Sequence, residues 1–571
     1  MDDKRTLLAF LLVGAIFLAM PYYYDLMGLT PPPQDEDASV EEALTSQQDT
    51  PPEVRRETTS TSVPSSTTPA PVPALDAVTE GFAEVLAAPA HERRVVMESG
   101  NQRLVFSTAG GALVSAELLE YKRPDGRIVD LVPPGGHGLS LSLRTEADER
   151  VIDLRDVHFE PDSYNVRAFD GGQAQVTLRA DLGGGRTIEK RVVMTDGEYG
   201  VHVEHRLRGL SEGSLAYIHW NGGIALAERD AKIDLQTMKV MTYFNDSLED
   251  VQVDEDEDDR WEERGEVSWA GVRNKYFLVA LAPGKGERHR VEMAGRPLTR
   301  EPYREYEFAI GRRVLGPDQT WETLFYAGPL DLERIEPYEN DLNRAVDLGF
   351  PVVRQIAEVL LTVFVAVHKV IPNYGWVIIL FGFVVKTLVY PLTHKSYESA
   401  AKMQELQPKL AVLKEKYKSD NQRLSQETMK LYKEEGVNPI GGCLPMLLQM
   451  PIFIALYQTF SSTIELRQAP FILWITDLSL PDEIFVAGFP LHVLPLLMAT
   501  AMFFQSRMTM KDPKQAALVY IMPVVMVFIM WDFSSGLVLY WTVFNVLQIG
   551  QQYLTNHLRA KKETAVQPAR R

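Results

Sequence analysis

Residues 375–392 read GWVIILFGFVVKTLVYPL, an apolar run that is long enough to span a bilayer and carries one charge, Lys386. A lone ammonium at the centre of a spanning helix costs about 2.5–3.5 kcal/mol on insertion scales. We therefore expect Lys386 to contact water, to pair with another group or to have a function. One alternative stays open. Lys386 lies about two helical turns from the end of the run, so its side chain can also extend to the membrane interface.

Composition limits the kinds of protein that this chain can be. Its 571 residues indicate several domains, and its net charge of −19 argues against a general nucleic-acid-binding protein. One cysteine, Cys443, excludes an intramolecular disulfide and a cysteine metal cluster. We find no GxxxxGK[ST] motif, and no nucleophile or metal-ligand cluster accompanies Lys386, so we expect no enzyme activity, cofactor or metal.

The first part of the chain predicts an anchor followed by a tether. Residues 1–24 have a charged start, an apolar run and then interfacial tyrosines, which predicts a first membrane span with a cytoplasmic N-terminus. Residues 25–92 are rich in Pro, Ser, Thr and acidic residues and predict a disordered periplasmic linker.

Residues 93–345 show short alternating runs separated by turn signals such as PDG and GGG. This pattern predicts a large all-β sandwich, which the first span would export. His202 and His205 would point to opposite faces of one strand, so they do not predict a metal site.

The region on either side of the Lys386 run predicts two kinds of helix. Residues 350–371 are apolar but contain four ionisable groups, and they predict an amphipathic helix on the outer interface that precedes the span at 374–392. Residues 393–438 are highly charged, have a break at 419–421 and carry many lysines, which predicts a cytoplasmic helical hairpin.

The rest of the chain predicts four more spans with alternating loop charge. The loop 461–485 has one basic residue, Arg467, whereas the loop 506–517 has three. By the positive-inside rule the first loop is periplasmic, and the second loop and the tail 557–571 are cytoplasmic. The expected fold is a multi-domain membrane protein with a bundle of six spans, five of them forming its core, and a periplasmic β-sandwich. The last four spans are 440–460, 486–505, 518–532 and 537–556.

Polar residues recur inside these spans. Trp541, Asn545, Gln548 and Gln552 share one helix face at i, i+4, i+7 and i+11. Amides often serve only as hydrogen bonds between helices, and prolines only as kinks, which would explain each residue alone. Together with Lys386 they favour a water-filled cavity that opens to the cytoplasm. Further residues of this kind are Gln449, Gln458, Pro445, Pro451 and Pro523.

Four strings resemble the YidC membrane protein insertases, which are related to the mitochondrial Oxa and chloroplast Alb proteins. They are YPLTHKS at 390–396, VNPIGGCLPMLLQMPIFIALY at 437–457, ELRQAPFILW at 465–474 and SGLVLY at 535–540. The whole chain resembles the Gram-negative form. The resemblance implies an inner-membrane insertase and chaperone that takes nascent segments into a hydrophilic groove and releases them into the bilayer, alone or with the Sec translocon. Ribosome or signal recognition components would meet the cytoplasmic hairpin.

The resemblance also implies roles for individual residues. Lys386 matches the positive residue of the groove, which is commonly arginine in the family; lysine keeps the charge but lacks the planar fork. Two alternatives remain, a solute transporter and a membrane-tethered periplasmic carbohydrate-binding protein. The residues expected to line the substrate groove are Lys386, Gln449, Gln458, Tyr540, Trp541, Asn545 and Gln548, and those with a structural role are Gly442, Pro445, Pro451 and Pro523.

Overall fold

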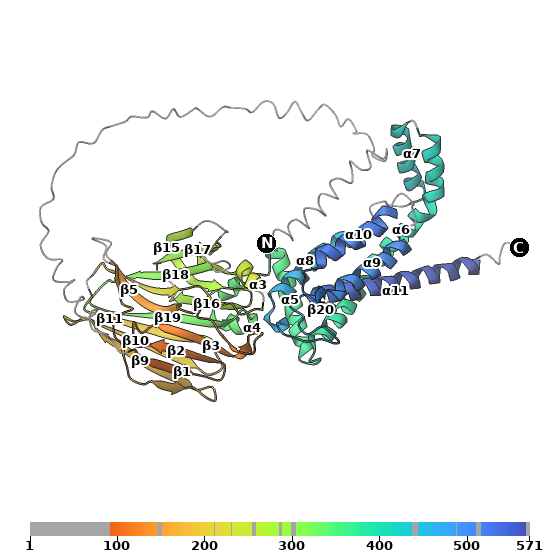
Figure 1. Cartoon of the computed structure of the whole chain (residues 1–571). Coiled ribbons are helices and arrows are strands. Elements are labelled where there is room, and N and C mark those ends of the chain that lie inside the picture. Colours follow the sequence, from red (N-terminus) through yellow and green to blue (C-terminus); the bar gives the residue numbers. More distant parts are fainter. Residues whose placement is uncertain are drawn as a thin grey trace, which may run out of the picture.

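The computed structural model describes residues 92–144, 151–210, 212–229, 231–253, 258–284, 288–297, 304–418, 420–436, 444–486, 488–509 and 516–566. The predicted first span, all but the last residue of the predicted linker and Gly442 lie outside this part of the chain. The described residues form a β-sandwich and a helical bundle, which lie end to end (Figure 1).

The β-sandwich consists of two antiparallel sheets that share one strand. The first sheet runs β8–β1–β2–β3–β5–β12–β18–β17–β15, with β4 beside β3 and β6 beside β5, and β8 is its one parallel neighbour among the described pairings. Its strands are β1 (Arg94–Glu98), β2 (Gln102–Ser107), β3 (Leu113–Lys122), β4 (Ile128–Asp130), β5 (His137–Arg144), β6 (Val151–Asp153), β8 (Asn165–Arg167), β12 (Leu215–Asn221), β17 (Arg288–Pro297) and β18 (Arg304–Arg313).

The second sheet runs β7–β9–β10–β11–β19–β16–β15–β13–β14. The shared strand β15 pairs with β17 in its first half and with β13 and β16 in its second half, so it passes from one sheet to the other. The strands of this sheet are β7 (Glu160–Pro161), β9 (Gln173–Asp181), β10 (Thr187–Thr195), β11 (Gly200–Arg208), β13 (Lys239–Phe244), β14 (Ser247–Val251), β15 (Asp259–Arg273), β16 (Phe277–Pro283) and β19 (Asp318–Pro329).

Alternation along the strands builds the core between the two sheets. In β10 and β11, every second side chain is buried, as the sequence pattern predicts for a half-buried strand. The all-β sandwich is therefore confirmed, and His202 and His205 do lie on opposite faces of β11, the first exposed and the second fully buried. The short helix α3 (Ala231–Thr237) was not expected from the sequence.

The core also contains a buried lysine beside that histidine. Lys190 is opposite His205 in the register of β10 and β11, and its Nζ donates hydrogen bonds to the carbonyls of Gly111 at 2.7 Å and Leu139 at 2.5 Å. Burial lowers the pKa of Lys190 to about 7, and it lowers the pKa of His205 well below its usual range.

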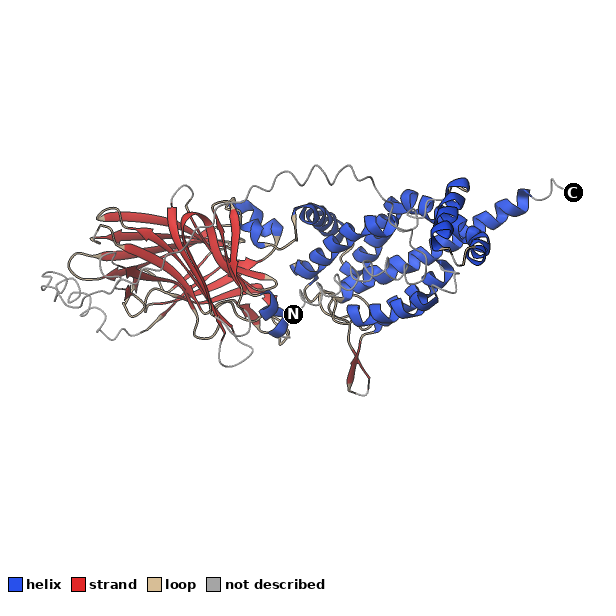
Figure 2. Ribbon diagram, turned by 90° about the horizontal axis from the view of Figure 1, so that it is seen from above, coloured by secondary structure: helices blue, strands red, loops and turns tan. Residues whose placement is uncertain are grey.

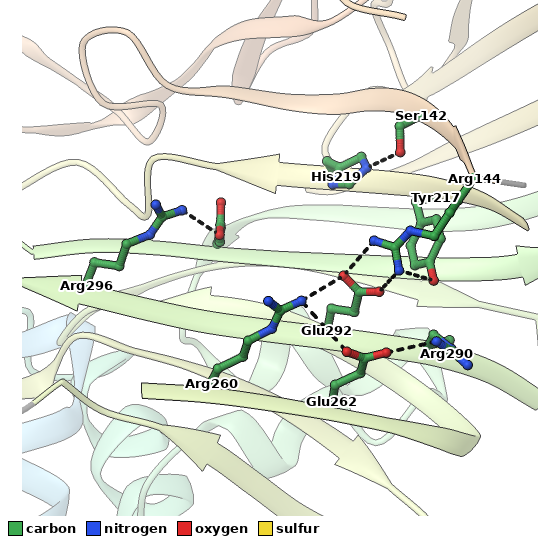
Figure 3. Close-up of polar contacts among 10 residues, drawn as sticks. Ser142, Arg144, Tyr217, His219, Arg260, Glu262, Arg290, Glu292 and Arg296 are labelled. Atoms are coloured by element: carbon green, nitrogen blue, oxygen red, sulfur yellow. Dashed lines mark hydrogen bonds and ion pairs between the residues drawn. The ribbon is translucent and has the colours of Figure 1, made fainter. Parts of the chain in front are cut away.

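Ion pairs join strands of the first sheet to one another (Figure 3). Glu292 of β17 accepts from Arg144 of β5 at 2.9 Å and lies 3.6 Å from Arg260 of β15, while Glu262 accepts from Arg290 at 2.9 Å. These charged groups link the paired strands β15 and β17, and Arg144 extends the network to β5, which lies beyond β18 and β12 in the sheet.

The bundle contains helices of unequal length. The longest is α6, which runs for 43 residues from Tyr374 to Lys416 with Pro391 and Pro408 inside it. The span predicted at 374–392 and the first part of the hairpin predicted at 393–438 are one continuous helix in the structure. The other helices are α5 (Pro351–His368), α7 (Asn421–Glu434), α8 (Leu444–Ser462), α9 (Val493–Thr509), α10 (Ala516–Met530) and α11 (Ser535–Val566).

By length and composition, α5 and residues 374–391 of α6 are each long and apolar enough to cross a membrane. Helices α9 and α10 are also apolar but shorter. Helix α9 begins later than the span expected at 486–505, because residues 484–491 form the hairpin of β20 (Ile484–Val486) and β21 (Phe489–Leu491). The number of membrane spans remains a prediction.

Helix α5 lies between the two parts and contacts the segment that follows the β-sandwich at both of its ends. At its start, Arg354 donates to the carbonyl of Asn343 at 2.9 Å. Just beyond its end, Lys369 lies 3.6 Å from Glu333 of the short helix α4 (Leu332–Ile335). The rest of this segment forms the 3-10 helices η1 (Glu336–Tyr338) and η2 (Leu342–Ala345).

A buried ion pair fixes the β-sandwich to the bundle. Arg467 follows the 3-10 helix η4 (Ile464–Leu466), and its Nε lies 2.6 Å from Glu228 Oε1, with the two side chains 3% and 1% exposed. Asp234 of α3 accepts the backbone N–H groups of Ala227 and Glu228 at 2.6 and 2.9 Å and so holds the segment that carries Glu228. Burial raises the pKa of Asp234 to about 6.

Candidate functional site

Lys386 is buried inside the helical bundle, between α6 and α11. Its side chain is 6% exposed, and its Nζ donates a hydrogen bond of 2.5 Å to Gln548 Oε1 of α11. The same nitrogen lies 4.4 Å from the centre of the Phe544 ring. Cation–π contact and a charge-assisted hydrogen bond both stabilise an ammonium in an apolar setting.

The partner of Lys386 is neutral. Among the side chains that the structure describes, no carboxylate forms an ion pair with Lys386, and the amide oxygen of Gln548 is its side-chain acceptor. An amide satisfies the hydrogen bond but leaves the positive charge uncompensated. This charge can therefore attract a negative group that enters the bundle.

The predicted polar face of α11 contacts three other helices. Trp541 meets Phe453 of α8 edge to face at 4.4 Å, Gln548 meets α6, and Gln552 donates to the carbonyl of Met508 on α9 at 3.5 Å. Asn545 is buried, and its Nδ2 has no partner among the described residues. The face thus lies at the meeting point of α6, α8, α9 and α11.

Aromatic side chains separate Lys386 from the start of α11. Tyr540 is buried, its ring lies 6.0 Å from Phe544 and 6.4 Å from Phe381, and its hydroxyl has no partner among the described residues. Phe544 was not predicted as part of this site. The i, i+4 spacing of Tyr540, Phe544 and Gln548 could have found it, because such residues share one helix face.

Other residues predicted for the groove lie elsewhere or cannot be placed. Gln458 lies near the end of α8, where a Cβ on Gly349 would meet its Cγ at 3.4 Å, so it contacts the junction with the β-sandwich. Pro451 and Pro523 lie inside α8 and α10, the first exposed and the second buried. The side chains of Gln449 and Pro445 lie outside the described part of the chain, as does Gly442.

Comparison with known families covers both parts of the molecule. The model of the YidC periplasmic domain matches residues 94–363, and the model of the 60Kd inner membrane protein family matches residues 366–563. The membrane protein insertase YidC of Chlorobium luteolum is 33% identical over 525 residues, which is 88% of each chain. The chain belongs to the YidC family of membrane protein insertases.

A second relative agrees with this assignment. The YidC insertase of Geobacter metallireducens is 32% identical and aligns over 98% of this chain and 99% of its own. A crystal structure described as an active YidC insertase with its first transmembrane domain resolved covers 84% of this chain and 98% of its own, at 20% identity and a TM-score of 0.36.

YidC family membership confirms the predicted fold class, an inner-membrane helical core with a periplasmic β-sandwich. It also supports insertion over the alternatives of solute transport and periplasmic carbohydrate binding, and the family name describes insertion rather than a catalysed chemical reaction.

Proposed function

We propose that this chain inserts nascent membrane proteins through a hydrophilic groove built around Lys386. The observation that carries the proposal is the buried ammonium on α6, which faces an amide on α11 and has no described carboxylate partner. An acidic group on an entering segment would gain a strong interaction there, because a charge pair is worth more in a low dielectric than in water.

In this proposal the Gln548 amide holds the position beside Lys386 that an acidic group of the substrate would take. Lys386 is covered by Gln548 and Phe544 in the present arrangement, so an entering carboxylate would replace the Gln548 amide as the acceptor of the Lys386 hydrogen bond. Trp541, at the interface of α11 with α8, would contact the apolar part of the segment. Release into the bilayer follows once the segment is apolar enough to leave the groove.

The proposed topology has six spans, with both termini in the cytoplasm and the β-sandwich in the periplasm. Helix α5 would lie on the outer membrane interface, which is supported by its contacts with Asn343 and Glu333 near the β-sandwich at both ends. The hairpin of α6 and α7 would cover the groove on the cytoplasmic side. We propose the Sec translocon, and ribosome or signal recognition components at this hairpin, as partners.

Insertion assays with four variants of Lys386 test the groove. In proteoliposomes, Lys386→Arg should insert a substrate with an acidic tail, whereas Lys386→Ala and Lys386→Glu should fail with it, because only the first keeps the positive charge. The matched control is the same substrate with an uncharged tail, which depends less on the cation.

Lys386→Leu separates this proposal from a lysine that only extends to the interface. If the side chain merely reaches the interface, leucine is neutral or improves membrane stability, because it removes the cost of a buried ammonium. Equal insertion of both substrates by Lys386→Leu and the unmodified chain would refute the groove.

A further inference from the structure

The hairpin of β20 and β21 is a short apolar projection between α8 and α9. Its two strands pair in the register Ile484–Leu491, Phe485–Pro490 and Val486–Phe489, and Gly488 in the turn has a φ of 86°. Residues 484–491 read IFVAGFPL and contain no charged or hydrogen-bonding side chain. A loop that faced only water would be expected to be polar, so this composition needs an explanation.

Both faces of the hairpin are apolar, and its large side chains are exposed. Side chains alternate between faces along a strand, so Phe485 and Pro490 share one face while Val486 and Phe489 share the other. Phe485, Val486 and Phe489 are 62%, 54% and 76% exposed. A flat protein surface could cover only one of these faces, whereas acyl chains can surround both.

The base of the hairpin is fixed to the end of the bundle that lies nearest the β-sandwich. Asp482 accepts the first N–H groups of α9, from Val493 and Leu494, at 2.8 and 2.9 Å, and accepts from Trp474 Nε1 at 2.9 Å. His492 donates to the carbonyl of Asp482 and meets the Trp531 ring edge to face at 4.6 Å. These contacts tie the hairpin to the start of α9 and to the end of α10.

From this base the hairpin extends sideways from the helices (Figure 2). In the proposed topology, this end of the bundle lies at the periplasmic surface of the membrane, and a sideways projection there runs along the outer leaflet. Exposed apolar side chains of the same loop, Ile472 and Leu473, and Trp376 at the start of α6 add to the apolar surface at this end.

We infer that the β20–β21 hairpin binds the acyl-chain boundary of the outer leaflet and anchors the loop between α8 and α9 to lipid. Aromatic side chains are favoured at this boundary, and an apolar hairpin without charges gains from leaving water there. The inference rests on the proposed topology, in which α9 and α10 span the membrane, but it does not depend on the groove.

Spin labels at single cysteines of the full-length chain in phosphatidylglycerol–phosphatidylethanolamine proteoliposomes test this inference. In a Cys443→Ala background, Phe489→Cys reports on the hairpin, Phe528→Cys on the exposed face of α10 and Phe169→Cys on an exposed position of the β-sandwich. The measurement is collision of each label with oxygen, which concentrates in lipid, and with a water-soluble nickel complex. All three side chains are exposed, so their replacement leaves the core intact.

We expect the labels at 489 and 528 to collide with oxygen several-fold more, relative to nickel, than the label at 169. A label at 489 that is as accessible to nickel as that at 169, with 528 still in lipid, would overturn the hairpin anchor and leave the span in place. Protection of 489 from both reagents would also overturn it, in favour of a protein partner. If the label at 528 were in water, the topology and the anchor would both fail.

Discussion

Gln548 is the residue whose chemistry decides how available the Lys386 charge is. In Gln548→Glu, a carboxylate of nearly the same shape would pair with the ammonium and compete with an acidic substrate segment. We expect insertion of an acidic-tailed substrate to fall about tenfold, which corresponds to about 1.4 kcal/mol, while an uncharged-tailed substrate is unaffected. The measurement is the rate of insertion into proteoliposomes.

Gln458→Glu is the matched control, because it makes the same change at a glutamine near the junction with the β-sandwich. An equal loss in both variants would contradict a specific pairing with Lys386.

His289 gives the β-sandwich a dependence on pH. Burial, with a smaller effect of the Arg312 charge, lowers the pKa of His289 to about 4. Between pH 6.5 and 4 the unfolded chain therefore binds a proton that the folded chain does not, and the free energy of unfolding falls as the pH falls, by up to about 1.4 kcal/mol per pH unit for one histidine. We expect hydrogen exchange of β17 and β19 in the full-length chain to lose protection on acidification from pH 6.5 to 5.

The variant His289→Phe should show a weaker pH dependence than the unmodified chain. His205 acts in the same direction, while Asp234, with its pKa raised to about 6, favours the folded state as the pH falls from 6 towards 4. Both groups are present in the two proteins, so the difference isolates His289. Identical pH profiles would show that this ring titrates as in the unfolded chain.

Individual residues could be predicted from the sequence where a polar or charged side chain lies in an apolar stretch. Lys386 stands out in an apolar run, and helical spacing placed Gln548 and Asn545 on one face of α11. The position of Gln458 near Gly349 could not be predicted, because the sequence of a helix does not show which neighbour each of its faces meets. The partner of Arg467 could not be predicted either, because Glu228 is distant in the sequence and belongs to the other part of the molecule.

The start of α6 packs tightly against the loop that follows α8. A Cβ on Gly375 would lie 2.0 Å from the Phe471 ring, whereas a Cβ on Gly382, two turns further along, would meet Val543 at 3.6 Å. We expect Gly375→Ala to destabilise the protein by about 1–3 kcal/mol, because the ring must move, and Gly382→Ala to have a much smaller effect. Thermal unfolding of the purified chain in detergent compares the two, and equal midpoints would contradict this packing.

Elements were predicted best where the hydrophobic period is strong. Strands of the sandwich and the long apolar helices follow from their repeats. Residues 486–491 of the hairpin were included in a span because they are apolar, and composition alone does not separate a short apolar strand from a helix. The Gly488 turn and Pro490 are the signals that could have placed the start of α9 later.

The whole molecule depends on the contact between its two parts. In Arg467→Ala, Glu228 would remain buried without its partner, which typically costs about 3–5 kcal/mol. We expect the residues around Glu228 and η4 to lose protection from hydrogen exchange while the strands of the sandwich keep theirs.

The double variant Arg467→Leu with Glu228→Leu is the control. Replacing both charges by apolar groups removes the cost of the unpaired carboxylate, so most of the protection should return. A double variant as unprotected as Arg467→Ala would mean that the junction needs the ion pair itself, and unchanged exchange in Arg467→Ala would mean that the pair does not hold the parts together.

The continuity of α6 has a mechanical consequence. A helix of 43 residues is about 65 Å long, so Lys386 and the far end of the helix at Lys416 belong to one continuous element. Pro391 and Pro408 both lack the N–H that a helix uses, and Pro391, which leaves the carbonyl of Thr387 without this donor, weakens α6 about one turn beyond Lys386. A force on the hairpin of α6 and α7 would therefore pass along α6 and bend the helix at Pro391, close to Lys386. A small rotation there would break the hydrogen bond between Lys386 and Gln548.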